Sequence, residues 1–532
     1  MKTYDFIIVG AGSAGCVLAN RLSAIPELNV LLIEAGGKDS KLEIKIPAAY
    51  ANLHRSEVDW KLATEPQSFL GGRSIYLPRG KVVGGSSSTN AMAYVRGNAF
   101  DYDDWKIPGW SYVDVLPYFK KSEHNVQFQD SFHGQGGELY VSHAESFQTP
   151  FARGFIEACQ QAGIPYNEDY NGAKQEGASY FQFTIKNGSR HSAAHAFLHP
   201  ILTRPNLTLL TQSTVKELII QDQRVVGVWL QNGLELKAQK EVILSAGAFH
   251  SPLLLQASGI GDPADLQAIG IPTKHVLPGV GKNLQDHLFL GVSSLSKKPL
   301  GQNHTLKPWP MMKGMAEYFI RKTGPLTASP LEAVAFGKTS NEVKGIDFQF
   351  HFAPIHFGDD YQVDPYNPKT FPTEDGFSIL PTLLKPTSRG YVRLRKGVDL
   401  GHPEIQPHFV STENDRNVLL KATKLAMEVI QQDGLAQFAK KWITPPQRES
   451  DEAIWNHIIQ QVETVYHPVG TCQMGFGEDA VVNGDLKVHG LDGIRVIDAS
   501  IMPTIVAGNT NAPVYMIAEK GADLILTSYG HT

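Results

Sequence analysis

The sequence predicts a mixed α/β protein, α+β overall, and three observations point to this class. Residues 4–9 form a short run of β-branched and aromatic residues that leads directly into a glycine-rich turn. Later apolar runs have the length and composition of strands, at 207–210, 215–220, 225–230 and 241–248. Residues 291–460 then alternate strand-like runs with a helical pattern. Together these features favour a Rossmann-like nucleotide-binding domain and a second, discontinuous domain built on an antiparallel sheet.

The N-terminal turn is a complete GxGxxG motif between two predicted strands. Gly10 would make the tight turn, Gly12 would let the backbone approach a pyrophosphate, and Gly15 would let the next helix pack closely on the strand. The pyrophosphate would lie at the N-terminus of that helix, where free N–H groups favour an anion. Glu34 ends the second strand, at 30–33, and would accept the hydroxyls of an adenosine ribose. The motif alone does not separate FAD from NAD.

Size and composition exclude several classes of protein. A chain of 532 residues is too long for one ordinary core, so we expect two or three domains. A net charge of −5 without long basic runs argues against nucleic acid as a partner. The cysteines Cys16, Cys159 and Cys472 lie far apart, which predicts neither a zinc site nor a disulfide framework.

The N-terminus and the hydropathy of the chain bear on its location. The chain enters its first strand at once, which leaves no room for a signal peptide. No apolar run reaches the roughly 18 residues that a membrane-spanning helix needs. We therefore expect a cytoplasmic protein, and peripheral contact with the inner membrane stays open.

A second glycine-rich stretch lies at 79–97. Its paired glycines and hydroxyl residues suit a loop laid against a cofactor, with backbone N–H groups within reach. The alternative is a flexible linker, but Val82, Val83, Met92 and Tyr94 would be unusual in a solvated linker.

The strand pattern divides the chain into alternating parts of two domains. We expect the nucleotide-binding domain to comprise 1–150, 201–290 and 461–532, because strand-like runs of the first type recur in each later part. The substrate domain would comprise 151–200 and 291–460.

Six ordered segments resemble the signatures of one family. They are residues 10–15, 79–90, 247–261, 277–287, 466–475 and 498–513. On these segments the chain resembles the glucose–methanol–choline (GMC) flavin oxidoreductases nearly end to end, nearest to their choline-dehydrogenase-like and alcohol-dehydrogenase branch. The resemblance implies FAD as the cofactor.

The resemblance also implies roles for individual residues. His467 would be the base beside the flavin, with Asn511 as its partner, and Val215 would hold the adenine through its backbone. Together with the motif residues, the expected cofactor contacts are Gly10, Gly12, Ser13, Ala14, Gly15, Glu34, Ala35, Arg79, Val83, Gly84, Gly85, Ser88, Asn90, Ala91, Met92, Ala93, Val215, Asp498 and Ala499.

Two departures from the family pattern affect the chemistry. Some members bond FAD through a histidine at the position of Thr89, so here we expect FAD to be bound non-covalently. Other members pair two histidines, whereas Asn511 fills the second place here. His467 would then be the one titrating group, and an imidazole with an ordinary pKa of about 6.5 is suited to accept the alcohol proton.

Substrate contacts are less well specified by the sequence. Glu332 lies where choline-oxidising relatives keep an acid, but relatives that act on uncharged alcohols keep one too, so it does not identify choline. Tyr466 and Phe352 are further candidates for the pocket wall. His191, His195 and His199 have helical spacing, yet further ligands are lacking and Arg190 is adjacent, so we expect no metal site.

The leading interpretation is oxidation of a primary alcohol to an aldehyde, with a quinone, dye or oxygen as the electron acceptor. The first alternative is an FAD-containing lyase or light-driven decarboxylase on the same scaffold. A non-catalytic flavin-binding protein and an NAD enzyme are weaker alternatives, because His467 and the 79–97 loop argue against them. The sequence does not predict the alcohol, the physiological acceptor or the oligomeric state.

Overall fold

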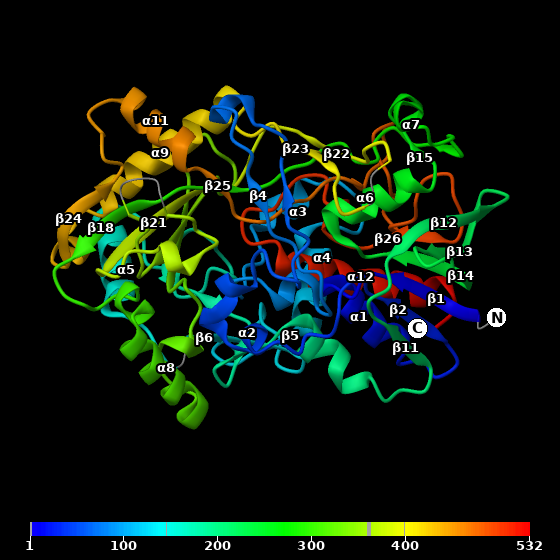
Figure 1. The fold of residues 1–532 in the computed structure, drawn as a ribbon, viewed down its shortest axis with the longest axis horizontal. Coiled ribbons are helices and arrows are strands. Elements are labelled where there is room, and N and C mark those ends of the chain that lie inside the picture. Colours follow the sequence, from blue (N-terminus) through cyan, green and yellow to red (C-terminus); the bar gives the residue numbers. More distant parts are fainter. Residues whose placement is uncertain (1–2, 145, 359–362, 398–399, 532) are drawn as a thin grey trace.

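The computed structural model describes residues 3–144, 146–358, 363–397 and 400–531, which form two sheets with helices packed around them (Figure 1). The first sheet has the order β11-β2-β1-β14-β13-β12, with β26 beside β14. Its strands are β1 Thr3–Val9, β2 Val30–Ile33, β11 Leu207–Leu210, β12 Val215–Gln221, β13 Arg224–Leu230, β14 Glu235–Leu244 and β26 Ile494–Val496.

The strands at the centre of the first sheet are parallel, and their apolar residues are buried because both faces of the sheet are covered. β1 pairs in parallel with β2 and β14, and β26 pairs in parallel with β14. Helices α1 (Ser13–Leu22) and α12 (Asn511–Ser528) lie side by side against it, so the blue and red ends of the chain meet in Figure 1. β12 and β13 form the predicted hairpin, in which Asp222 and Gln223 both have positive φ, at 46° and 60°.

The second sheet is antiparallel, with the order β24-β18-β21-β20-β19-β7; β17 also pairs with β21, and β25 pairs with β17. Its strands are β7 Gly177–Tyr180, β17 Leu288–Phe289, β18 Val292–Ser296, β19 Ala333–Gly337, β20 Phe348–Ala353, β21 Gly376–Leu383, β24 Ala439–Thr444 and β25 Glu463–Thr464. The apolar faces of α5 (Pro150–Gln161) and α9 (Glu413–Val429) pack on it through a core that includes Phe155, Phe352 and Ala426. The predicted fold class is confirmed, and the four boundaries between the five domain segments stay predictions.

The remaining elements connect and cover the two sheets. The other strands are β3 Leu62–Ala63, β4 Tyr76–Leu77, β5 Glu123–Asn125, β6 Leu139–His143, β8 Gln182–Phe183, β9 Ile185–Lys186, β10 Ser189–Arg190, β15 Ile260–Gly261, β16 His275–Val276, β22 Tyr391–Arg393 and β23 Glu404–Gln406. The other α-helices are α2 Leu42–Lys45, α3 Ala99–Asp103, α4 Tyr112–Ser122, α6 Gly247–Ala257, α7 Pro263–Ile269, α8 Pro308–Arg321, α10 Asp433–Ala436 and α11 Asp451–Gln461. Among the described residues, no helix is long and apolar enough to span a bilayer.

Helix α6 begins earlier than its sequence predicts. Pro252 suggests a start at Leu253, but the helix begins at Gly247 and contains the proline. Pro252 has no N–H to donate to the carbonyl of Ala248. The hydroxyl of Thr471 donates to that carbonyl instead, at 2.5 Å, so a contact from a distant segment removes the cost of the interruption.

The 79–97 stretch is a packed loop and not a linker. Val82, Val83, Met92 and Tyr94 are all buried. The backbone N–H of Gly84 donates to the carbonyl of Ala11 at 2.7 Å, which joins this loop to the turn after β1.

Candidate active site

A cavity of about 700 Å³ runs between the two sheets. It is lined by the turn after β1, the 79–97 loop, the ends of β20 and β21, and the segment before α12. The predicted residues on its wall are Gly10, Gly12, Ser13, Ala14, Glu34, Ala35, Arg79, Gly85, Asn90, Ala91, Met92, Ala93, Val215, Tyr466, His467, Asp498, Ala499 and Asn511. Residues more than 400 positions apart in the sequence therefore face one space.

Four predicted cofactor residues support this wall and do not line the cavity. Gly15 packs against the turn, since a Cβ there would overlap the carbonyl oxygen of Gly10. Val83 and Gly84 hold the second loop on the first, and the hydroxyl of Ser88 donates to the carbonyl of Val83 at 2.8 Å.

The two glycine-rich loops meet closely at the cavity wall. Gly10 has φ +102° at the turn, and a Cβ on it would lie 2.5 Å from the carbonyl oxygen of Ser245. A Cβ on Gly85 would lie 2.7 Å from the Cα of Gly12. Free backbone N–H groups and the absence of side chains make this a cradle for a phosphate group.

Glu34 directly follows β2 and lines the same cavity. Its Oε2 accepts the N–H of Ala11 at 2.9 Å and its Oε1 accepts the N–H of Gly36 at 2.8 Å. Burial raises the pKa of its carboxyl to about 7, and this effect outweighs the two backbone hydrogen bonds, which lower the pKa. The remaining lone pairs are available to ribose hydroxyls, so the glycine cradle and this acceptor fit an adenine dinucleotide.

At the other end of the cavity, His467 is held from three directions. Its backbone N–H donates to Oδ1 of Asp286 at 2.7 Å. Its Nδ1 lies 3.0 Å from Nδ1 of His287, and its Nε2 lies 3.2 Å from Nδ2 of Asn509. Burial lowers the pKa of His467 well below 6.5, and the neighbouring His287 and His351 lower it further.

The hydrogen-bond partners specify one tautomer for the two histidines. The amide of Asn509 is oriented by Gln349, which donates to its Oδ1 at 3.3 Å, so Nδ2 of Asn509 donates to Nε2 of His467. The proton of His467 is then on Nδ1 and is donated to His287. Nε2 of His287 carries its own proton and donates to the carbonyl of Leu384 at 2.9 Å. Nε2 of His467 is then unprotonated, and its single lone pair accepts the N–H of Asn509 at the cavity wall.

The predicted partner of His467 requires correction from Asn511 to Asn509. Asn511 begins α12, where its side chain accepts from the hydroxyl of Ser13 at 2.7 Å and donates to Tyr515 at 3.2 Å. Asn509 lies two residues earlier, in the turn before the helix, and meets the imidazole. Both side chains border the cavity, but the start of the helix turns that of Asn511 toward α1.

The chain is similar to known proteins over nearly its whole length. Sequence models of the GMC oxidoreductases match residues 4–289 and 386–518. The chain belongs to the GMC oxidoreductase family. It is 41% identical to the alcohol dehydrogenase [acceptor] of Pseudomonas putida over 98% of this chain and 96% of that protein.

Two further similarities extend across the whole chain. The chain is 42% identical to the mitochondrial choline dehydrogenase of Homo sapiens, over 98% of this chain and 89% of that protein. A formate oxidase from Aspergillus oryzae, studied for its FAD modification, superposes with a TM-score of 0.91 at 28% identity, over 99% of each chain. This GMC oxidoreductase is an FAD-dependent enzyme, and the cradle, Glu34 and Val215 are the residues that would hold the cofactor.

Two of the three predicted substrate residues of this GMC oxidoreductase lie away from the cavity. Both carboxylate oxygens of Glu332 are used by Thr149, which donates its N–H at 2.9 Å and its hydroxyl at 2.5 Å. Phe352 lies in the core beneath the second sheet, stacked on Phe155 at 4.9 Å. Tyr466 does line the cavity.

His351 is a further residue of the cavity wall. It lies on β20, and its Nδ1 is 3.1 Å from the hydroxyl of Thr382. Its buried Nε2 has no protein partner. Because β20 alternates its side chains, His351 and Ala353 face the cavity while Phe350 and Phe352 face the core.

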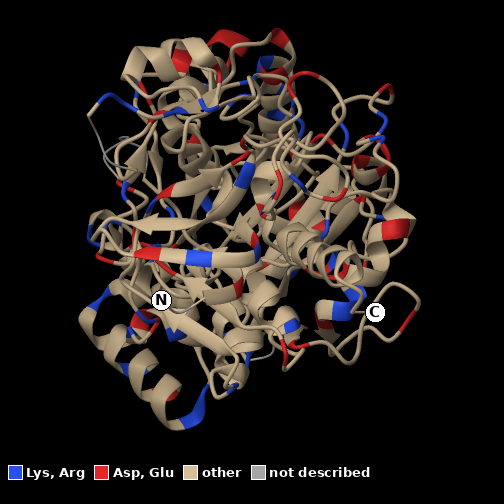
Figure 2. Cartoon of the chain, turned by 90° about the vertical axis from the view of Figure 1, so that its right-hand side faces the viewer, with Lys and Arg blue, Asp and Glu red and all other residues tan. Residues whose placement is uncertain are grey.

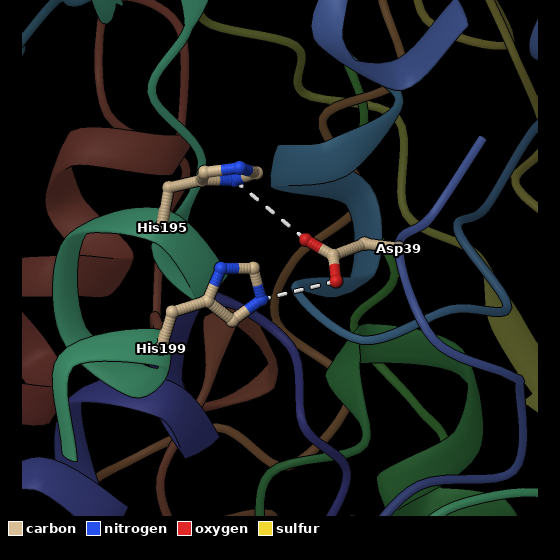
Figure 3. A group of neighbouring side chains, drawn as sticks. All are labelled: Asp39, His195 and His199. Carbon is tan, nitrogen blue, oxygen red and sulfur yellow. Dashed lines mark hydrogen bonds and ion pairs between the residues drawn. The ribbon is translucent and has the colours of Figure 1, made fainter. Parts of the chain in front are cut away.

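The histidines with helical spacing converge on one aspartate, as Figure 3 shows. Nε2 of His199 lies 3.1 Å and Nδ1 of His195 lies 3.6 Å from the carboxylate of Asp39. These contacts tie the segment after β2 to the helical turn Ala194–Leu198. The three ligand atoms lie close enough to one another to hold a small cation. The absence of a metal here stays a prediction.

Proposed function

We propose that this enzyme oxidises an uncharged primary alcohol to an aldehyde, with His467 as the base. The carrying observation is the unprotonated Nε2 of His467 at the cavity wall. Its lone pair accepts from Asn509 and would take the hydroxyl proton once an alcohol displaces that amide. A base of this kind accepts the hydroxyl proton. Bound FAD supplies the acceptor for the hydride that leaves the alcohol carbon.

The protonation state of His467 suits this role. Burial keeps its pKa well below the ordinary value, so the imidazole is neutral at pH 7 before substrate binds. Nε2 of His351, for which the described residues offer no hydrogen-bond partner, borders the same space. His351 lies on β20 and His467 in the segment after β25, so side chains from two separate elements would position the alcohol, and positioning of this kind lowers the barrier.

The walls near His467 favour a substrate with an apolar chain. They include Phe289, Ile355, Phe357 and Leu380. Choline would require compensation for its cationic headgroup, and the carboxylate of Glu332 is committed to Thr149. We therefore place medium-chain primary alcohols ahead of choline. The similarity to the alcohol dehydrogenase [acceptor] of Pseudomonas putida supports an alcohol as the substrate.

We further propose that FAD is held without a covalent bond, because Thr89 offers no nucleophilic ring nitrogen at the cavity wall. Acid precipitation should release yellow cofactor into the supernatant, whereas a covalent flavin would stay with the protein. The electron acceptor is a quinone or oxygen, and the enzyme acts in the cytoplasm or at the surface of the inner membrane.

The test is anaerobic stopped-flow recording of the flavin band with octan-1-ol, benzyl alcohol, glucose and choline. We expect bleaching by the aliphatic alcohol at a rate at least about tenfold above that with choline. Faster bleaching by choline would contradict the substrate assignment. No bleaching by any alcohol would contradict oxidation and favour a lyase or decarboxylase on the same scaffold. Admission of oxygen afterwards distinguishes an oxidase, which reoxidises quickly, from a quinone-linked dehydrogenase.

A further inference from the structure

Helix α8, Pro308–Arg321, projects from the lower left of the molecule in Figure 1. Of its residues only Gly314 and Tyr318 are buried, so a narrow stripe attaches it to the body. Its large apolar side chains are exposed instead: Trp309 by 77%, Ile320 by 79%, Met312 by 59%, Phe319 by 50% and Met315 by 42%. An exposed apolar patch of this kind on a folded chain marks a surface of interaction.

The exposed apolar residues of α8 form one continuous face. At about 100° per residue, Met315, Phe319, Met312, Ala316, Trp309 and Ile320 fall within an arc of about 140°. Gly314 and Tyr318 lie on the opposite side, against the body. Lys313, Glu317 and Arg321 lie on one flank of the helix, between the exposed apolar arc and the buried stripe. We call the six residues in the first arc the α8 face.

The charges around the α8 face are predominantly positive. Lys307, Lys313, Arg321 and Lys322 lie within or beside the helix, and Glu317 is the one acid between them. Figure 2 shows this helix with blue segments at the lower left edge. The whole chain has a net charge of −5, so the charge around α8 is opposite in sign to that of the protein as a whole. A helix with an apolar face and flanking cations is typical of binding to an anionic membrane surface.

The α8 face is continuous with the rim of the cavity. Met315 both lines the cavity and is 42% exposed, and Leu42 on α2 does the same at 45%. The hydroxyl of Tyr318 on α8 donates to the carbonyl of Lys45 on α2 at 3.4 Å, which joins the two helices. The cavity therefore approaches the surface between α2 and α8.

We propose that α8 docks this enzyme on an anionic phospholipid bilayer, with the α8 face in the interface and the cavity rim at the lipid surface. The helix lies in the plane of the interface and does not cross it. Trp309 and Phe319 enter the boundary between headgroups and acyl chains, where aromatic side chains are favoured. Lys313, Arg321 and Lys322 meet lipid phosphates. A lipophilic molecule could then pass between the bilayer and the cavity without crossing water. The docking does not depend on which reaction the cavity performs.

The test is flotation of the holoenzyme with vesicles of phosphatidylglycerol and phosphatidylcholine in equal amounts, and with vesicles of phosphatidylcholine alone. We expect binding to the anionic vesicles that weakens as salt is raised. The variant Trp309→Ser/Phe319→Ser/Ile320→Ser should bind at least about tenfold more weakly. Val113→Ser/Phe476→Ser is the matched control, since these side chains are exposed by 77% and 71% on other segments. The control should bind as the native protein does.

Each variant should stay folded, because every substituted side chain is exposed. The content of bound flavin and the thermal midpoint check this. The proposal is overturned if the native enzyme does not float, or if the triple variant floats as well as the control. A dimer in sedimentation velocity that the triple variant abolishes, without vesicle binding, would assign the α8 face to a second copy of the chain. A charge variant, Lys313→Glu/Arg321→Glu/Lys322→Glu, should lose the preference for anionic vesicles, and retention of that preference would also contradict the proposal.

Discussion

Tyr466 adopts a backbone conformation that most residues avoid, and the adjacent His467 depends on it. Its φ is +68°, in the left-handed region, where a bulky side chain is strained. The guanidinium of Arg79 donates to the carbonyl of Tyr466 at 2.6 Å, and the hydroxyl of Thr464 accepts its N–H at 2.8 Å. Arg79 therefore borders the cavity and also holds the segment that carries His467 in place.

Replacement of His467 tests its role as the base. We expect His467→Ala to retain FAD, since the cradle is remote from this side chain, and to slow flavin reduction by at least about 100-fold. Anaerobic stopped-flow measurement at saturating alcohol gives the rate directly. Reduction at a rate near that of the native enzyme would contradict the assignment. Ser213→Ala, on the far part of the cavity wall, serves as the control for a general effect of substitution.

The pH dependence of flavin reduction follows from the buried imidazole. A base works only when neutral, and the folded pKa of His467 lies below 6.5 because burial disfavours its charged form. The rate should therefore stay level from pH 8 to 6.5 and fall only as pH drops through the lowered pKa. Burial raises the pKa of the neighbouring Asp286 to about 6, so its titration would fall in the same pH range. The pH profile is therefore also measured in Asp286→Asn, which removes that titration. A midpoint at or above 6.5 in both proteins would be the contrary result.

The two asparagines before α12 should give different defects. Asn509→Ala removes the donor to Nε2 of His467, so we expect flavin reduction to slow by about tenfold with FAD binding unchanged. Asn511→Ala removes bonds to Ser13 and Tyr515, so we expect weaker retention of FAD. Titration of the apoprotein with FAD, together with stopped-flow reduction, separates the two effects. The reverse pattern would restore Asn511 as the partner of His467.

At the scale of elements, the turn after β1 and the 79–97 loop act as one unit. Gly84 donates to the carbonyl of Ala11, and Gly85 lies against Gly12 with no room for a side chain between them. The turn after β1 has no regular structure of its own, and the 79–97 loop has only the short 3-10 helix Gly85–Ser88. Their mutual contact fixes the backbone N–H groups that the cofactor phosphates would meet.

The contact predicts a specific effect of Gly85→Ala. The new Cβ would lie 2.7 Å from the Cα of Gly12, so the loops must separate, at a cost of about 1–3 kcal/mol. We expect a corresponding loss of FAD affinity in fluorescence titration. Gly72→Ala is the matched control, because Gly72 also has a positive φ, +79°, but has nothing within 4 Å of the added Cβ. Equal effects in both variants would mean that backbone strain and not the contact is responsible.

At the scale of the whole molecule, the two ends of the chain close the first domain. Arg21 on α1 donates to Glu519 on α12 at 2.6 Å and to Glu138 at 2.5 Å. The side chain of Glu519 is fully buried, and its other cationic neighbour, Lys121, lies 3.6 Å away. These charges join segments separated by 498 residues.

Loss of Arg21 should therefore destabilise the protein. Arg21→Ala leaves Glu519 buried with one distant cation, and we expect a loss of about 3 kcal/mol in the free energy of unfolding. Arg153→Ala removes an exposed pair with Glu157 on α5 and should change little. Thermal midpoints followed by flavin release and by far-UV circular dichroism provide the comparison. A similar midpoint shift in the two variants would count against a role for the buried pair.

Much of the molecule follows from local sequence signals. The β1 strand, the glycine turn and the strands near 207–210, 215–220 and 225–230 are each predicted, because period and turn chemistry are local properties. The candidate site was less accessible. Asn509 and Asn511 have similar surroundings in sequence, and only the start of α12 separates their directions. Glu332 resembled a substrate ligand until its contact with Thr149, 183 residues away, was seen.

The sequence by itself determined that a strand, three glycines and a terminal acid would form a nucleotide-binding unit, since these residues interact with near neighbours and with one cofactor. It also determined that His467 would face that unit, through a segment with a family signature. Only the tertiary structure decided which partners His467 has, which acid is free for a substrate, and which apolar side chains stay exposed on α8. The physical reason is that burial and side-chain pairing depend on segments that approach each other only after the two sheets have packed.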